Sequence, residues 1–249
     1  MNDFLHSFFD VHEMAQVFPS LLTEGLTNTL LIAALAIVLG LAVGGLLAVL
    51  LIARPWWARL PARVYVDVFR GLPAVVTVSL IGLGLPVAGL HLFGTSPVGY
   101  AVLAVGLINA AYIAEILRSG IQSVPVGQME AGRSLGMSYL STLALVIAPQ
   151  ALRNVLPALA NQFIVSVKES ALVYLLGLSV GQRELYFIAQ QQQATSYNSS
   201  ALVLAGLFYV AITIPLTYLV NWLHRRLGDG RRLPAQVAST ADVLEGTAA

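Results

Sequence analysis

Long stretches without a charged side chain limit this chain more than any other feature. No Asp, Glu, Lys or Arg occurs between Glu24 and Arg54, or between Arg70 and Glu115. A helix that crosses the hydrocarbon core needs roughly 20 mostly apolar residues, and both tracts are long enough. Charged residues make up only 10% of the chain, too few to cover a water-facing surface. The sequence therefore predicts an all-α membrane protein.

We predict about five transmembrane helices. The second uncharged tract is too long for one helix and is interrupted at Pro86, Gly94 and Pro97, so we divide it in two. The predicted spans are residues 29–52, 64–85, 98–117, 155–178 and 201–223. The fourth has uncertain bounds, and 142–163 is an alternative. Residues 25–227 then form the transmembrane domain, after an N-terminal segment 1–24 and before a polar tail 228–249 that is predicted to be disordered.

The arginines indicate an orientation, since Lys and Arg accumulate in cytoplasmic loops. They cluster after the first predicted span, after the third and after the last, at Arg54, Arg59, Arg63, Arg118, Arg133, Arg225, Arg226, Arg231 and Arg232. The first residues are acidic and contain no Lys or Arg. We therefore expect a multi-pass protein of the cytoplasmic membrane with its N-terminus outside and its C-terminus inside.

Small residues recur every four positions in two of the predicted spans, at Ala36, Gly40, Gly44 and Ala48 and at Gly106, Ala110 and Ala114. Such stripes let helices approach closely in lipid. They are typical of packing within a chain, and a seam between two copies is the other interpretation.

The cytoplasmic segment 119–151 is predicted to fold into two short helices. Pro125 suits the first turn of a helix, and Glu130 and Arg133 have the spacing of an ion pair on its surface. Gly136 follows where a left-handed residue ends a helix. Ser138 then caps a second helix, which Pro149 stops or kinks.

Glu130-Ala131-Gly132, Gly136, Val146 and Pro149 resemble the EAA loop of ABC importer permeases in residue type and spacing. That pattern has Ala, Ile and Leu where this chain has Gly132, Val146 and Ala148. Further blocks are similar to the polar amino acid permeases of the histidine, glutamine, glutamate and arginine type. They comprise residues 65–73, 111–121, 124–131, 149–153 and 161–163, and a Lys-Glu-Ser-Ala-Leu sequence at 168–172 where the family has Lys-Asp-Thr-Ser-Leu.

The resemblance implies a type I ABC importer permease, whose EAA loop docks into a groove on a separate ATPase subunit. It implies as partners two ATPase copies, a second permease subunit that is either identical or related, an extracytoplasmic amino-acid-binding protein and membrane lipid. The residues it assigns to ATPase coupling are Gly127, Gln128, Glu130, Ala131, Gly132, Gly136 and Pro149. It implies no cofactor in this chain, because ATP and Mg would be bound by the ATPase.

The residues support this division of labour on their own. A P-loop needs a lysine in a Gly-rich sequence, and the only lysine here, Lys168, follows Phe-Ile-Val-Ser-Val. The low net charge gives no indication of nucleic-acid binding.

Ionisable side chains inside a membrane are costly and mark candidate functional positions. Lys168 and Glu169 lie in the fourth predicted span and are candidates for the translocation pathway, where they would meet the zwitterionic head of an amino acid. The alternative is a self-neutralising structural pair at a helix break.

Asn109, Tyr112 and Glu115 share one predicted helix face and could line the same pathway. Alternatively Glu115 pairs with Arg118.

Arg70 is expected at a helix break before Gly71 and Pro73, with its side chain on neighbouring carbonyls or reaching the interface. Asn161 is expected either to line the pathway or to form an interhelical hydrogen bond.

Three other functions compete with transport driven by a separate ATPase. A stand-alone channel or ion-coupled carrier would leave the elaborate cytoplasmic segment without a role. Gly177-Leu178-Ser179-Val180-Gly181 matches the nucleophile motif of serine hydrolases, but His224 is predicted about 30 Å away across the hydrocarbon. An anchor without transport activity would not need Lys168 and Glu169 in a span.

Overall fold

The computed structural model describes residues 2–94 and 96–228, and the regular structure within them is helical. The first helical run comprises α1 (Asn2–Phe9), α2 (Val11–Ser20), the π-helical turn η1 (Leu21–Gly25) and α3 (Leu26–Leu51). Its stretch from His6 to Leu51 has 46 residues. At about 1.5 Å per residue this is more than twice the thickness of the hydrocarbon core. The helix of the first predicted span therefore begins well before residue 29.

The remaining elements follow in chain order. They are α4 (Trp56–Gly71), α5 (Ala74–Ser79), the π turn η2 (Leu80–Gly84), α6 (Leu85–Val87), α7 (Pro97–Gln122), α8 (Val126–Ser134), α9 (Tyr139–Thr142), the π turn η3 (Leu143–Ile147), α10 (Ala148–Glu169), the 3-10 helix η4 (Ser170–Leu176), α11 (Leu185–Ser196) and α12 (Ser200–Gly228). Four helical runs are long and apolar enough to cross a membrane, and α4 with α5–α6 makes a fifth if the bent pair counts as one span. The expected all-α fold with about five spans is confirmed.

The second predicted span is not one continuous helix, which corrects the expectation for 64–85. α4 ends at Gly71, α5 begins at Ala74, and the two halves are bent by 107°. Leu72 takes an extended conformation, with φ −80° and ψ 138°. A residue before a proline is driven out of the α region, and Pro73 is the next residue.

The fourth span is part of a helical run of 38 residues from Tyr139 to Leu176. This run contains both the predicted bounds 155–178, apart from the last two residues, and the alternative 142–163. Pro149 does not stop it, contrary to one expectation. The π turn η3 lies just before the proline, and its closing bond runs from Ala148 N–H to the Leu143 carbonyl. The wider turn carries the helix past the position where the proline supplies no donor.

α3 and α7 form the centre of the bundle, and the small-residue stripes lie where they meet. A Cβ on Gly40 would lie 2.8 Å from the Asn109 Cβ, and one on Gly44 would lie 2.7 Å from the Ala110 carbonyl oxygen. Gly106 leaves similar room for Leu39. Packing within the chain is therefore the role of these glycines.

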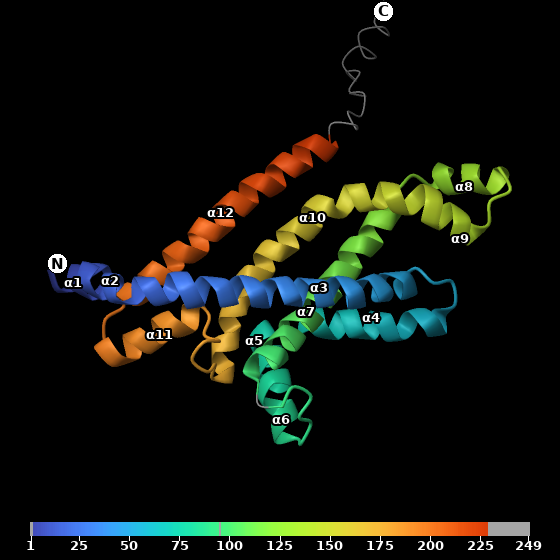
Figure 1. Ribbon diagram of the computed structural model, residues 1–249. Coiled ribbons are helices and arrows are strands. Elements are labelled where there is room, and N and C mark those ends of the chain that lie inside the picture. Colours follow the sequence, from blue (N-terminus) through green and yellow to red (C-terminus); the bar gives the residue numbers. More distant parts are fainter. Residues whose placement is uncertain (1, 95, 229–249) are drawn as a thin grey trace, which may run out of the picture.

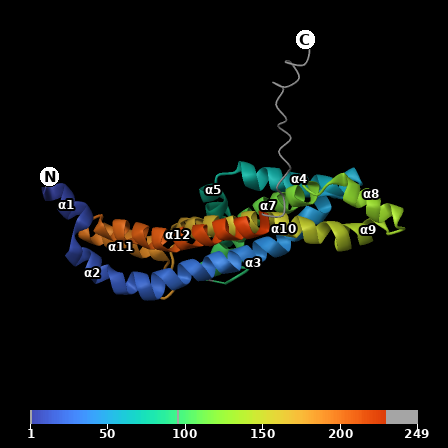
Figure 2. The ribbon, with the colours of Figure 1, turned by 90° about the horizontal axis from the view of Figure 1, so that it is seen from above.

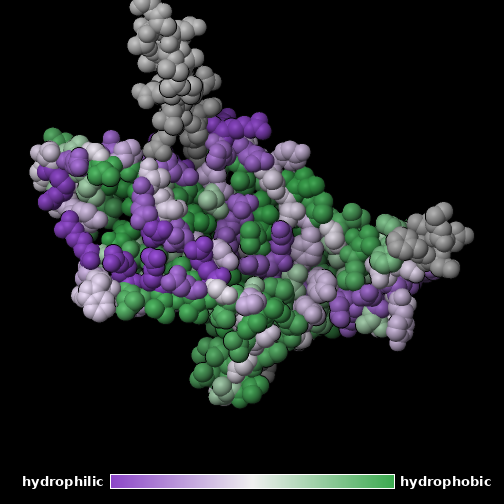
Figure 3. Space-filling view, turned by 180° about the vertical axis from the view of Figure 1, so that it is seen from behind, coloured by the Kyte–Doolittle hydropathy of each residue, from purple (hydrophilic) through white to green (hydrophobic). Residues whose placement is uncertain are grey.

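The two ends of the molecule carry different structures (Figures 1 and 2). α8 and α9 form a projection at one end, and α1, α2 and α11 lie at the opposite end. Figure 3 shows an apolar protrusion at the lower edge, and the turn around α6 exposes large apolar side chains such as Val87, Leu90 and Leu92. Apart from Gly228, the predicted tail 228–249 lies outside the described residues.

Candidate functional site

The projection at one end of the bundle has the two-helix form expected from the sequence. Pro125 is extended and precedes α8 by one position, so it opens the helix. Gly136 has a φ of 83°. Its N–H donates to the Arg133 carbonyl and the Met137 N–H to the Gly132 carbonyl, each at 3.1 Å. This pair of bonds is the Schellman closure that the left-handed glycine permits, so the predicted helix end at Gly136 is confirmed.

The second short helix is capped as expected, because the Ser138 hydroxyl oxygen accepts from the Ser141 N–H at 3.1 Å. The predicted Glu130–Arg133 ion pair is wrong: among the described residues Glu130 has no ion-pair partner. Arg133 instead donates to the Met137 carbonyl at 2.8 Å and supports the turn. The Arg133 guanidinium therefore binds a carbonyl of the closing turn instead of the Glu130 carboxylate, which helix spacing alone would favour.

Gly132 is the point where α8 touches α9. Its position is buried, and a Cβ there would lie 2.9 Å from the Thr142 Oγ1 and closer still to the Thr142 Cγ2. The glycine that replaces the second alanine of the EAA pattern thus fits a tight contact with a β-branched partner.

The predicted coupling residues lie on this projection, except Pro149, which is in the first turn of α10. Gly132 is buried, and the exposed members are Gly127, Gln128, Glu130, Ala131, Gly136 and Pro149. A small apolar cluster of Val124, Ile147 and Ala151 attaches the projection to α7 and α10. The result is a firm base with an exposed, mostly uncharged tip.

One contact of this region was missed. The Arg54 guanidinium lies 4.8 Å from the centre of the Tyr139 ring, which connects the turn between α3 and α4 to the start of α9. The sequence contained no signal for it, since the pairing depends on how two distant loops meet.

Asn109 is fully buried between three helices. Its Nδ2 donates to the Ser166 hydroxyl at 3.0 Å, and its Oδ1 accepts from Gln162 Nε2 at 2.9 Å. Ser166 in turn donates to the Ala33 carbonyl at 3.3 Å. These bonds join α7, α10 and α3, and both polar atoms of the Asn109 side chain are bonded to residues of this chain. Its predicted place in a pathway stays a prediction.

Glu115 forms an ion pair with Arg118, which was the alternative to a polar stripe through Asn109 and Tyr112. Arg118 Nε donates to Glu115 Oε2 at 2.8 Å. Arg70 lies in the last turn of α4, directly before the break, as expected. Its guanidinium lies 5.6 Å from the centre of the Tyr112 ring rather than on neighbouring carbonyls.

Lys168 and Glu169 occupy the last turn of α10, where the α-helix becomes the 3-10 helix η4. Among the described residues the two form no ion pair. Lys168 is exposed, while the Glu169 Oε2 atom is buried and has no hydrogen-bond partner there. The self-neutralising pair is therefore absent from this conformation. Asn161 is exposed on α10, and no interhelical hydrogen bond to it occurs in the described part.

The loop between η4 and α11 contains polar residues that sequence reasoning did not single out as a site. Glu184 is fully buried and caps α11 by accepting from the N–H groups of Tyr186 and Phe187, each at 2.6 Å. The Tyr209 hydroxyl donates to the same carboxylate at 3.0 Å. Burial raises the pKa of Glu184 to about 7, although these three donors act in the opposite direction.

The serine of the hydrolase-like motif lies in the same loop. Ser179 is exposed, and Gly177 and Gly181 on either side have φ values of 67° and 85°. The loop does not run from a strand into a helix, which is the setting that the nucleophile motif requires.

A family model described as the binding-protein-dependent transport system inner membrane component matches residues 36–229. The chain belongs to this family. The matched part of this transport component includes the projection, the break in the second span, and Lys168 with Glu169.

Individual relatives agree with the family. The chain is 36% identical over 208 residues to the arginine transport system permease protein ArtQ of Bacillus subtilis (82% of this chain, 91% of the relative). It is 37% identical over 210 residues to the glutamine transport system permease protein GlnP of Escherichia coli strain K12 (83% and 93%). A third relative, the glutamate/aspartate import permease protein GltK of Escherichia coli O157:H7, is 34% identical over 221 residues (86% and 97%).

Solved structures share the fold of this transport component. A crystal structure described as an amino acid ABC transporter with histidines has a TM-score of 0.76 at 34% identity, covering 86% of this chain and 96% of that chain. The MetNI methionine ABC transporter in an inward-facing conformation has a TM-score of 0.70 at 22% identity, covering 84% and 97%. At that identity the second match supports the fold alone.

Proposed function

We propose that this chain is the membrane-spanning permease subunit of an ATP-binding-cassette importer that carries amino acids, polar or charged ones in particular, across the bacterial cytoplasmic membrane. The supporting observation is the projection of α8 and α9, closed by left-handed Gly136 and held on the ends of α7 and α10. A plain connection between two spans needs no such structure. The relatives named as arginine, glutamine and glutamate/aspartate permeases support the substrate class.

In this proposal the exposed tip around Glu130 and Gly136 contacts a separate ATPase subunit, which binds ATP and Mg. Two ATPase copies serve two permease subunits, the second being identical or related. An extracytoplasmic binding protein delivers the amino acid at the end that holds α1, α2 and α11. The N-terminus lies outside and the C-terminus inside, as the arginine distribution favours.

Lys168 and Glu169 are the proposed contacts for the charged head of the amino acid. Within residues 2–94 and 96–228, Lys168 has no ion-pair partner and one buried oxygen of Glu169 has no hydrogen-bond partner, and the two residues are adjacent at a change of helix type. Such groups cost free energy in a membrane unless a ligand or a solvated pathway meets them. Arg70 with Tyr112, at the break in the second span, is a further proposed part of the pathway, and Asn109, Glu115 and Asn161 are assigned to it more peripherally.

The test begins with co-purification of the tagged chain and mass spectrometry of its partners. The complex is then reconstituted in liposomes, and amino-acid uptake and ATP hydrolysis are measured. We expect Gly136→Trp to abolish uptake while membrane insertion stays normal, and Asp67→Asn, at an exposed acid on α4, to leave both unchanged. The proposal would be refuted by ATP-coupled transport in Gly136→Trp, or by uphill transport that the isolated chain drives with an ion gradient alone.

A second variant tests the pathway. Lys168→Ala should change the KM for uptake or the preference among amino acids more than it changes the amount of protein in the membrane. Uptake kinetics equal to wild type at equal abundance would remove Lys168 from the pathway.

A further inference from the structure

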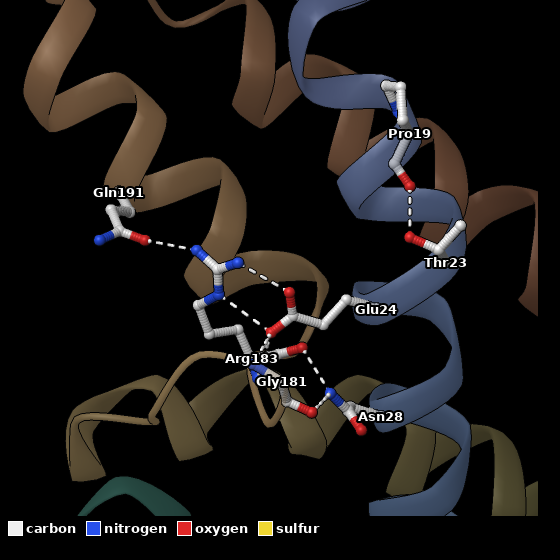
Figure 4. Close-up of polar contacts among 7 residues, drawn as sticks. All are labelled: Pro19, Thr23, Glu24, Asn28, Gly181, Arg183 and Gln191. Carbon is white, nitrogen blue, oxygen red and sulfur yellow. Dashed lines mark hydrogen bonds and ion pairs between the residues drawn. The ribbon is translucent and has the colours of Figure 1, made fainter.

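A cluster of polar contacts joins η1 and the start of α3 to the loop before α11 (Figure 4). α11 lies at the end of the molecule opposite the projection (Figure 1). Both oxygens of Glu24 are used by Arg183: Oε1 accepts from Nε at 2.9 Å, and Oε2 accepts from Nη2 at 2.7 Å. Glu24 Oε1 also accepts from the backbone N–H groups of Gly181 at 2.8 Å and Arg183 at 3.0 Å. The two side chains are only 17% and 20% exposed for Glu24 and Arg183, so the pair is largely screened from water.

Neighbouring residues of the same helix bind the same loop. The Asn28 side chain donates to the carbonyls of Gly181 at 3.1 Å and Arg183 at 3.0 Å. Thr29 Oγ1 accepts from the Leu185 N–H at 3.2 Å. Glu24, Asn28 and Thr29 therefore hold residues 181–185 at backbone atoms as well as at the guanidinium. We call these contacts the Glu24–Arg183 clamp.

Apart from the clamp, the loop between η4 and α11 is held by Glu184, which caps α11 and accepts from Tyr209, and by a turn in which the Gln182 N–H donates to the Ser179 carbonyl at 2.9 Å. The loop contains two left-handed glycines, Gly177 and Gly181, and no regular hydrogen-bond ladder. Without the clamp, its backbone N–H and C=O groups would have to find other partners. Arg183 is further tied to α11, since Nη1 donates to Gln191 Oε1 at 3.1 Å. The clamp thus sets the position of the loop relative to both helices.

The loop is the direct continuation of α10 through the short 3-10 helix η4. Val173, Leu176 and Leu178 of this continuation are buried in the central apolar cluster. One end of the α10 run therefore carries the projection at α8 and α9. The other end passes Lys168 and Glu169 into η4 and then into the loop that the clamp holds. If the η4 end of this helical run is held, movement of the projection tilts the run about that end. If the η4 end is not held, the same movement can shift the whole run.

We propose that the Glu24–Arg183 clamp is a positioning device for transport, which fixes the outer end of α10 and η4 while the projection moves. This inference rests on the proposed function. Glu24 and Arg183 need not touch the transported solute. They hold η4, which contacts α5 and α7, and with it the neighbouring Lys168 and Glu169. Movement at the projection then opens and closes the pathway without shifting these two residues along it.

The experiment uses the complex with its ATPase in liposomes and measures ATP hydrolysed per amino acid taken up. Glu24→Gln removes the negative charge without a change in size, and Arg183→Gln removes the guanidinium and shortens the side chain. Arg63→Gln is the matched control, because Arg63 forms an exposed ion pair with Asp67 at 3.8 Å and has no part in the clamp. Abundance in the membrane, thermal unfolding and basal ATP hydrolysis are recorded for every variant.

We expect both clamp variants to keep basal hydrolysis and to need about fivefold or more ATP per amino acid, a typical size for coupling between distant sites. The double variant should be no worse than either single variant, since the two residues act as a pair. A role in stability alone would lower abundance and leave the ATP ratio unchanged. An unchanged ratio in correctly inserted protein therefore overturns the inference.

Removal of one partner of a screened ion pair can prevent folding. If so, Asn28→Ala decides the matter, because it removes two loop contacts and leaves both charges paired. A rise in ATP hydrolysed per amino acid that is smaller than in the charge variants supports the clamp, and an unchanged ratio refutes it. Failure of the wild-type complex to couple at all would instead refute the proposed function, so the two failures can be told apart.

Discussion

Gly132 offers the sharpest test of how the projection is built, because the EAA pattern has alanine where this chain has glycine. In Gly132→Ala the new methyl carbon would lie 2.9 Å from Thr142 Oγ1 and nearer to Cγ2. Carbon atoms prefer separations of about 3.5–4.0 Å, so α8 would have to move by about 1 Å. Overpacking of this kind costs about 1–3 kcal/mol.

The gain in helix propensity from glycine to alanine offsets about 1 kcal/mol of that cost. The net penalty of about 1 kcal/mol corresponds to roughly a fivefold loss of the competent arrangement of the projection. We expect a loss of this size in affinity for the ATPase and in amino-acid-stimulated hydrolysis, with membrane insertion unchanged. The measurement is a titration of the purified chain with its ATPase, followed by uptake in liposomes.

Two further variants make the reasoning refutable. Gly127→Ala changes the same helix where a Cβ meets open space. Because Gly127 is itself a proposed coupling residue, this variant measures the effect of an added methyl group on the docking surface without overpacking, and Gly132→Ala should bind the ATPase more weakly than it does. Gly132→Ala with Thr142→Ala moves the methyl group from one side of the contact to the other and should restore binding. Thr142→Ala removes the hydroxyl that donates to the Ser138 carbonyl at 3.0 Å. That carbonyl still accepts from the backbone N–H of position 142 at 2.9 Å. A Gly132→Ala variant as active as Gly127→Ala, or a double variant no better than the single one, would refute the explanation.

Other changes give equally definite expectations. Gly136→Ala puts a Cβ on a residue with φ 83° and should weaken ATPase binding by roughly tenfold, since the left-handed conformation costs a non-glycine residue about 1–2 kcal/mol; binding equal to that of Gly127→Ala would count against it. Burial raises the pKa of Glu184 from 4.5 to about 7, so between these two pH values the folded state holds a proton that the unfolded state has lost. The free energy of unfolding should therefore fall by up to about 3 kcal/mol as pH rises from 5 to 8. Thermal unfolding across that range checks this, and Glu184→Gln should flatten the curve. Asn109→Leu leaves the Gln162 amide and the Ser166 hydroxyl without their buried partner and should lower stability by about 1–3 kcal/mol, which denaturation in detergent would detect; an unchanged midpoint would contradict the assigned network.

Local chemistry along the chain was sufficient for several parts of the site. Gly136 ends a helix in left-handed conformation because the residues before it favour a helix and glycine alone pays no steric penalty there. Ser138 caps the next helix for an equally local reason. The Glu130–Arg133 pair failed as a prediction because helix spacing only brings two side chains within reach. The Met137 carbonyl, presented by the turn, is the partner that Arg133 takes.

The sequence by itself determined the membrane class, the number of apolar helices and the position of the projection, because hydrophobic length and turn residues act over short stretches. Only the tertiary structure decided which helices meet and which polar groups pair. Glu24 and Arg183 are 159 positions apart, and Asn109 and Gln162 are 53 apart. No local pattern links such residues. The Asn109–Gln162 bond is fixed by the packing of α7 on α10, and the Glu24–Arg183 pair by the contact of η1 with the loop before α11. A buried polar group at such a contact must find a neighbour or remain unbonded.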